Sequence, residues 1–216
     1  MFKDLLRAAG RVEVARCEPV QRIFLMRISG GEARGITLRV PKGDAVRPAT
    51  DGMRQAVFSS IAARVPGAMF LDLFAGSGAY GLEALSRGAS GGYFVEKNNI
   101  AVGCLRQNLS AVCKSVRRTE NDFKVAASDV LSWSLPAGSV APDLVFVDPP
   151  YSIIQDMAPR LFARLDEMLR EKNDPVVAFE MPGEMEIAPL GWTAVKRLGK
   201  GVRQPTVTFF RKTSSL

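Results

Sequence analysis

Four consecutive residues, Asp148-Pro149-Pro150-Tyr151, place a carboxylate, two rigid prolines and an aromatic ring directly after an apolar run. A carboxylate and a backbone carbonyl can accept the two N–H groups of an exocyclic amine on a base, and a tyrosine ring can stack on that base. Because such an amine is a weak nucleophile, holding its nitrogen in a reactive geometry favours methyl transfer without a strong base. The chain contains no histidine. A strand-ending turn remains the alternative interpretation of the motif alone.

A second cluster lies on a glycine-containing turn. The apolar run 69–73 includes Asp72, and a tight turn over residues 74–78 follows it. Glycines let a backbone approach a ligand closely. Asp72 would repel a pyrophosphate but would attract the positive amino group of S-adenosylmethionine, so charge favours that cofactor over NAD. A purely structural α/β turn is the alternative.

Two further acids follow predicted strands. Glu96 ends the run 92–96, and an acid at the end of the second strand binds ribose hydroxyls in nucleotide-binding α/β folds. Asp129 follows the run 123–127, where it could accept from an adenine amine while the Val130 amide donates to the ring. A helix cap explains Asp129 equally well.

The elements that must position these residues alternate between strand and helix patterns. Apolar, β-branched runs predict strands at 69–73, 92–96, 123–127, 144–147 and 175–180. Helical spacing predicts helices from about 51, from 79, over 97–115 and over 157–168. Two later runs, 193–197 and 206–211, predict a closing hairpin at the sheet edge. This alternation indicates an α/β fold with a parallel sheet, whose ligands bind at the carboxyl ends of the strands.

The basic part of the chain precedes this core. Gly30-Gly31 predicts a tight turn between two short strands, 26–29 and 35–40, and hence an appended β-hairpin. Thr50 or Asp51 can cap the helix that follows. Arginines on a loop and first helical turn suit phosphate contacts, although a solvated charged face is the alternative. The residues that we expect to contact RNA are Arg27, Arg34, Arg47, Thr50 and Arg54.

Composition limits the class of protein. The 216 residues are 47% apolar with a formal net charge of +7, which fits one folded core and a polyanionic partner. No apolar run approaches the roughly 18 residues that span a bilayer, and residues 1–7 lack a signal-peptide core. The three cysteines lack metal-site spacing and predict structural thiols in a reducing cytoplasm. We expect a cytoplasmic monomer without a metal.

Four stretches together carry a resemblance to a known family. They are 27–31 with Arg34-Gly35; 47–51 with Arg54; 72–78 with Gly81-Leu82-Glu83-Ala84; and 148–151. The chain resembles a class I S-adenosylmethionine-dependent methyltransferase, and more closely the RsmD-like family that methylates the guanine 2-amino group in bacterial 16S ribosomal RNA. The resemblance covers residues 26–210 and leaves 1–25 as an extension, 26–50 as an RNA-contacting hairpin and 51–216 as the methyltransferase domain.

The resemblance implies a Rossmann-like, seven-stranded mixed sheet flanked by helices, with 16S rRNA or a small-subunit assembly particle as the partner. It implies a catalytic role for Asp148, Pro149, Pro150 and Tyr151. It implies S-adenosylmethionine binding by Asp72, Phe74, Ala75, Gly76, Ser77, Gly78, Glu96, Lys97, Asp129 and Val130. Two alternatives stay open: a DNA or RNA adenine-N6 or other exocyclic-amine methyltransferase, and a non-catalytic RNA-binding assembly factor with the same fold.

Overall fold

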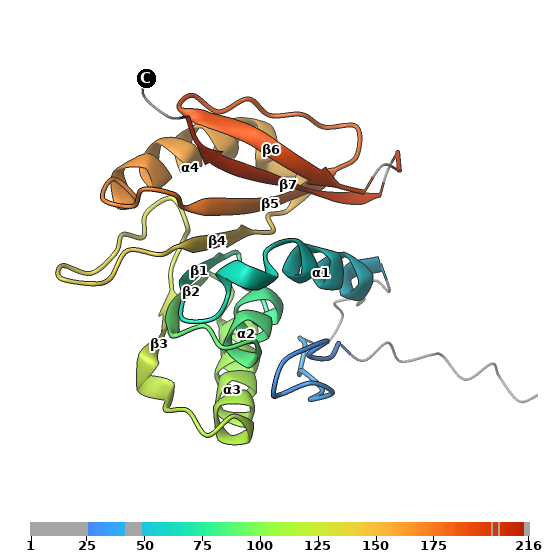
Figure 1. Cartoon of the computed structure of the whole chain (residues 1–216), viewed down its shortest axis with the longest axis vertical. Helices are drawn as coiled ribbons and strands as arrows, with labels where there is room; N and C mark the ends of the chain where they lie inside the picture. Colours follow the sequence, from blue (N-terminus) through green and yellow to red (C-terminus); the bar gives the residue numbers. More distant parts are fainter. Residues whose placement is uncertain (1–25, 42–48, 200, 203, 214–216) are drawn as a thin grey trace, which may run out of the picture.

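The computed structural model describes residues 26–41, 49–199, 201–202 and 204–213. Seven strands form one sheet in the order β3-β2-β1-β4-β5-β7-β6 (Figure 1). β1 to β5 run parallel, and β7 joins the sheet antiparallel to both β5 and β6. The strands are β1 Met69–Leu73, β2 Gly91–Glu96, β3 Phe123–Ala127, β4 Leu144–Val147, β5 Val176–Pro182, β6 Trp192–Leu198 and β7 Pro205–Lys212.

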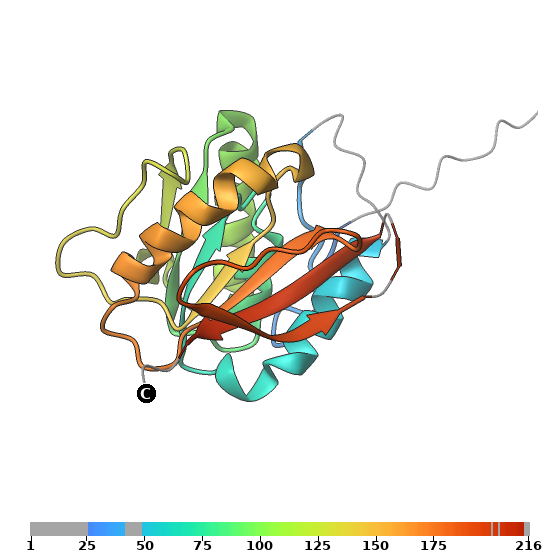
Figure 2. The same cartoon turned by 90° about the horizontal axis from the view of Figure 1, so that it is seen from above.

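Helices cover both faces of the sheet (Figure 2). α1 Ala49–Ser60, α2 Ala79–Ser86 and α3 Asn99–Ser115 pack on one face, and α4 Ile154–Met168 packs on the other. The described part of the chain also contains three short 3-10 helices: η1 Ala62–Arg64, η2 Glu120–Asp122 and η3 Tyr151–Ile153. Because both faces are covered, β1 and β4 are almost wholly buried and therefore read as continuous apolar runs.

The predicted strands and the α/β fold class are confirmed. β1, β3 and β4 have the predicted bounds, and the other strands differ by one or two residues at an end. The last two strands form the expected hairpin, with β6 at the edge and β7 inserted beside β5. None of the helices in the described part of the chain is long and apolar enough to cross a membrane.

Residues 26–41 form a less regular structure than the predicted hairpin. Antiparallel pairing is limited to one bridge, between Arg27 and Thr37, and the turn lies at 32–35 rather than at Gly30-Gly31. Gly31 has φ of 77° and packs against the end of α2, where a Cβ would lie 1.9 Å from the Ser86 carbonyl oxygen. Here the glycine serves close approach to α2, which the turn prediction did not foresee. We call residues 26–41 the N-terminal segment.

The expected helix cap is also wrong. α1 begins at Ala49, so both Thr50 and Asp51 lie inside the helix instead of before it. The Asp51 carboxylate instead accepts a hydrogen bond from the Arg54 guanidinium, one turn later, at 2.7 Å.

Candidate active site at the carboxyl edge of the sheet

The predicted cofactor and catalytic residues meet at one edge of the sheet. β1 pairs with β2 on one side and β4 on the other, and all three end at this edge. Asp72 lies one residue before the end of β1, Glu96 ends β2 and Asp148 follows β4. Parallel pairing therefore brings together residues that are far apart in the sequence, at the place where open α/β sheets bind ligands.

The turn after β1, residues 74–78, has an unusual backbone, and we call it the cofactor loop. Phe74 has φ of 58°, a left-handed conformation that is uncommon for a residue with a side chain and that clusters at functional sites. Gly76 (φ 54°) has open space beside it, because a Cβ there would find its nearest neighbour, the Phe74 carbonyl oxygen, 4.0 Å away. A ligand can therefore approach this backbone closely.

Glu96 holds the cofactor loop. Its Oε2 accepts a hydrogen bond from the Gly76 amide at 2.9 Å, and its Oε1 accepts one from the Asn98 amide at 2.7 Å. Both donors are backbone groups, so the carboxylate is fixed in orientation while its side chain stays partly exposed. That arrangement suits the two vicinal hydroxyls of a ribose.

Asp72 is buried beneath the loop, with 2% of its surface exposed. Its Oδ2 accepts a hydrogen bond from the Gly81 amide at 2.8 Å. The pKa of Asp72 is raised to about 8, mainly by burial and also by the charge of Glu96, against the lowering effect of that hydrogen bond. A buried acid with this pKa is stabilised by a cation, so the site fits the amino group of S-adenosylmethionine.

Gly81 is a residue that the sequence interpretation left without a role of its own. Besides binding Asp72, it lies where a Cβ would meet the Phe94 ring at 2.2 Å. Gly76, Gly78 and Gly81 also have the G-x-G-x-x-G spacing of dinucleotide-binding loops, so glycine spacing does not separate NAD from S-adenosylmethionine. The distinction rests on Asp72.

The structure brings Lys97 and Asp129 together, with 3.9 Å between Nζ and Oδ2. The Asp129 carboxylate also accepts a hydrogen bond from the Leu131 amide at 2.9 Å, but residues 130–132 form a turn and no helix begins here, so the helix-cap alternative is wrong. Lys97 and Asp129 are exposed and Val130 is buried. All three lie at the ends of β2 and β3, beside the cofactor loop.

On the other side of β1, two tyrosines meet a carboxylate that the sequence interpretation missed. Glu180, near the end of β5, is 5% exposed. It accepts hydrogen bonds from the Tyr80 hydroxyl at 3.0 Å and from the Tyr151 hydroxyl at 3.4 Å. Asp148 and Pro150 are exposed at the end of β4. The rule that identified Glu96, an acid ending an apolar run, would also have found Glu180.

The residues predicted to contact RNA have different environments. Arg27 and Arg34 are exposed on the N-terminal segment. Arg54 is 2% exposed, and its guanidinium binds the Arg27 carbonyl at 2.6 Å and the buried Glu83 carboxylate at 3.5 Å. The prediction that Arg54 contacts RNA is therefore not supported by its position. Arg47 and the Thr50 side chain lie outside the described residues.

Buried polar groups join the N-terminal segment to α2 and α3, and we call this contact the seam. Glu83 accepts hydrogen bonds from the Ser29 amide and hydroxyl, both at 2.7 Å. Asn108 on α3 exchanges hydrogen bonds with the Arg39 backbone, at 2.8 and 2.9 Å, and donates to the Ser77 carbonyl at 2.9 Å. The seam therefore links the N-terminal segment directly to the cofactor loop.

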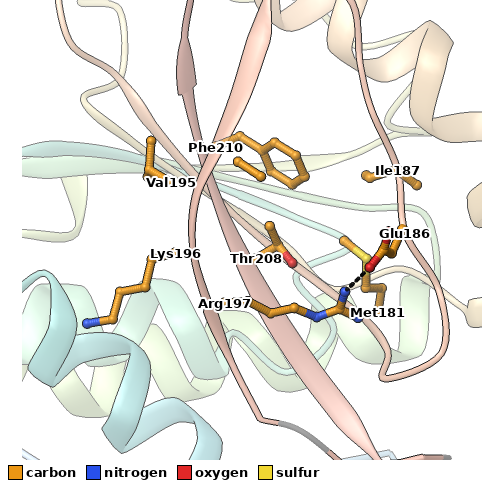
Figure 3. Close-up of a pocket in the computed structure, with 9 residues that line it drawn as sticks. Met181, Glu186, Ile187, Val195, Lys196, Arg197, Thr208 and Phe210 are labelled. Atoms are coloured by element: carbon orange, nitrogen blue, oxygen red, sulfur yellow. Dashed lines mark ion pairs between the residues drawn. The ribbon is translucent and has the colours of Figure 1, made fainter.

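A hollow of about 370 Å³ lies between β6, β7 and the loop after β5 (Figure 3), and none of the predicted site residues lines it. Arg197 reaches across it to Glu186, at 3.6 Å, and also donates to the Pro182, Gly183 and Met185 carbonyls. These bonds fix the backbone that directly follows Glu180. In the described part of the chain, no group of three or more acidic or cysteine side chains could hold a metal ion.

Strand order, the acids at β1 and β2 and the motif after β4 define the class of protein: the fold is that of a methyltransferase. A solved structure of the methyltransferase-like protein SMU.776, complexed with SAH, shares this fold at a TM-score of 0.60 and 12% identity, over 82% of this chain and 54% of that one. The Escherichia coli protein yhhF is closer, with a TM-score of 0.70 and 26% identity over 88% of this chain and 99% of that one.

The particular family follows from the sequence match. Residues 26–210 match the family model described as conserved hypothetical protein 95, and the chain belongs to this family, which contains the RsmD proteins. Ribosomal RNA small subunit methyltransferase D of Escherichia coli K12 is 39% identical over 126 residues. That match spans 58% of this chain and 60% of the relative.

Proposed function

We propose that this protein transfers a methyl group from S-adenosylmethionine to the exocyclic 2-amino group of a guanine in small-subunit ribosomal RNA. The observation that carries the proposal is the arrangement of the sheet edge. The acids of β1 and β2 flank an open glycine loop, and the Asp-Pro-Pro-Tyr motif follows β4, which is paired directly with β1. A methyl donor on the loop would therefore lie beside an amine held at Asp148.

The cofactor would be held by groups that the fold already orients. The buried Asp72 would receive its amino group, Glu96 its ribose hydroxyls, and Asp129 with the Val130 amide its adenine. When bound, S-adenosylmethionine supplies a positively charged sulfonium that carries the methyl group. Phe74, Ala75 and Ser77 complete the loop, and Lys97 pairs with Asp129.

The substrate amine would be held after β4. The Asp148 carboxylate accepts one amine hydrogen and the Pro149 carbonyl accepts the other, which directs the nitrogen lone pair at the methyl group. Pro150 stiffens this backbone and the Tyr151 ring stacks on the base. After transfer the nitrogen is positively charged and acidic, so its proton leaves to Asp148 or to water. The target base must leave its RNA stack to reach this edge.

RNA would be held by the exposed Arg27 and Arg34 of the N-terminal segment, together with Arg47. Arginine recognises phosphate with two parallel hydrogen bonds. The name of the Escherichia coli relative, which refers to the small ribosomal subunit, supports rRNA as the polyanion.

The decisive experiment incubates the protein with methyl-labelled S-adenosylmethionine and ribosomal particles from cells that lack it, followed by nucleoside analysis. Label in N2-methylguanosine of the small-subunit rRNA is the expected result. Label in N6-methyladenosine would identify the adenine-methylating alternative. Cofactor binding without label in any particle tested would favour the non-catalytic assembly factor.

A further inference from the structure

Glu180 is a buried carboxylate for which the proposed function has no role. β4 and β5 pair in parallel register up to Val147 opposite Phe179, and Asp148 and Glu180 are the residues that directly follow these two partners. Paired residues of parallel strands project to the same face, and neighbouring strands lie about 4.8 Å apart. The fold therefore sets two carboxylates side by side where the substrate amine is expected.

The environment of Tyr80 supports this placement. Its hydroxyl donates to Glu180, and its ring stacks on Phe146 of β4 with 5.4 Å between ring centroids and 17° between planes. Burial raises the pKa of Tyr80, and the negative charges of Glu180 and Asp148 raise it further. Both carboxylates therefore lie close to one fixed hydroxyl.

Glu180 has one firm hydrogen-bond partner, Tyr80, and one weak partner, Tyr151, that can be replaced. The Tyr80 bond and the Arg197 bonds to the following backbone fix its position. The Tyr151 hydroxyl lies at 3.4 Å, near the limit of a hydrogen bond. When the Tyr151 ring turns to stack on a base, a donor on that base can take the place of this weak bond.

Base chemistry then decides which base fits two adjacent acceptors. Guanine presents its 2-amino group next to the N1–H, so two donors lie side by side on its edge. Adenine and cytosine present an acceptor nitrogen beside their amine, and a second carboxylate would repel it. Leaving a buried charged acceptor without its donor costs about 1.5–3 kcal/mol, or about 10- to 100-fold in binding.

We propose that Glu180 accepts the N1–H of the target guanine while Asp148 holds its 2-amino group, so that Glu180 selects guanine among the bases that carry an amine. This inference rests on the proposed function and gives Glu180 direct contact with the substrate. The Asp-Pro-Pro-Tyr motif alone cannot make this distinction, because it binds only the amine.

The test uses particles in which the target nucleotide, once mapped, is replaced by 2-aminopurine, which keeps the 2-amino group but has an acceptor at N1. We expect wild-type kcat/KM to be about 10- to 100-fold higher for guanine than for 2-aminopurine. Glu180→Gln should bring this ratio close to one, because an amide can either accept from guanine or donate to 2-aminopurine.

Two control variants separate contact from positioning. Tyr80→Phe removes the hydroxyl but leaves the carboxylate, so its ratio should match the wild type. Glu186→Gln makes the same change at a carboxylate that is 88% exposed on the following loop, and should also leave the ratio unchanged. If Tyr80→Phe lowers the ratio as much as Glu180→Gln does, Glu180 acts only by positioning tyrosine and the inference is wrong.

The wild-type protein alone tests the inference even if Glu180→Gln fails to fold. Equal rates on guanine and 2-aminopurine would overturn the role of Glu180 and leave the proposed function intact. A wild type that methylates no guanine in any particle would instead overturn the proposed function itself.

Discussion

Buried charged groups of the seam and of the sheet edge differ in how completely the protein itself satisfies them. In the seam, Glu83 binds the Ser29 backbone and hydroxyl and pairs with Arg54 and Arg87. At the sheet edge, Asp72 accepts a hydrogen bond from one amide, and its pKa is raised to about 8. A buried charge with a full set of partners is structural, whereas one held at a cost indicates a missing ligand.

Breaking the seam should give the largest effect on stability. Arg54→Ala leaves Glu83 with Arg87 as its remaining guanidinium partner, so we expect a loss at or below the about 3–5 kcal/mol that removing one member of a buried ion pair costs. Chemical denaturation measures this loss. Arg34→Ala, at an exposed arginine, is the matched control and should change stability by less than about 0.5 kcal/mol. If Arg54→Ala is as stable as the wild type but binds RNA more weakly, the RNA-contacting role of Arg54 is correct after all.

Removing the Asp148 carboxylate, which would accept a hydrogen of the amine, should lower catalysis without weakening cofactor binding at the ends of β1 and β2. Asp148→Ala is expected to lower kcat by about 10²- to 10³-fold, the usual effect of losing one group aimed at the reacting centre. Calorimetry should find cofactor affinity within about twofold of the wild type. Asp156→Ala, on the first turn of α4, controls for loss of a nearby carboxylate. Equal losses of methyl transfer and of cofactor binding would contradict the separate roles given to Asp148 and to the cofactor-binding residues.

Asp72 makes the stability of the sheet edge depend on pH. Its folded pKa of about 8 exceeds the ordinary aspartate value of 3.8, so the folded protein retains a proton that the unfolded chain releases. Stability of the cofactor-free protein should therefore fall between pH 4 and pH 8, by up to about 1.4 kcal/mol per pH unit from this group. Asp72→Asn should remove this fall and weaken cofactor binding by about tenfold or more. Denaturation at pH 5 and pH 8 measures the first effect.

The same protonation predicts proton release when the cofactor binds. At pH 7 the carboxyl of Asp72 is mostly protonated, and a bound cation favours its ionised form. Titration calorimetry in two buffers of different ionisation enthalpy should report release of up to about one proton per cofactor. Absence of proton release at pH 7 would contradict a raised pKa, because the carboxyl of Asp72 would then already be ionised before the cofactor binds.

The smallest expected effects belong to the exposed arginines. Arg27→Ala and Arg34→Ala should each weaken RNA binding equally across sequences and reduce the salt dependence of log K by about one. Filter binding at several salt concentrations measures both. Unchanged salt slopes in both variants would remove the N-terminal segment from the RNA interface.

The sequence best predicted those features that depend on a local pattern of residues. Apolar runs located β1, β2, β4 and β5 because these parallel strands are almost wholly buried and therefore apolar along their length. Asp72, Glu96 and Asp148 were found because they end or follow those runs. The burial of Arg54 was not foreseen, because a charged residue beside a helix start is expected to be exposed until its partner is known. That partner, Glu83, is 29 positions later (83 minus 54), and no local pattern connects them.

The insertion of β7 between β5 and β6 has a consequence for how the chain folds during synthesis. Glu180 lies on β5 opposite Val207 of β7, and β7 is made after both β5 and β6. Until β7 leaves the ribosome, β5 has an unpaired edge that can associate with other chains. The cofactor loop, built from β1 and β2, can assemble earlier. In a nascent chain, the cofactor-binding part on β1 and β2 should therefore fold first, and the base-binding part beside β5 should fold last.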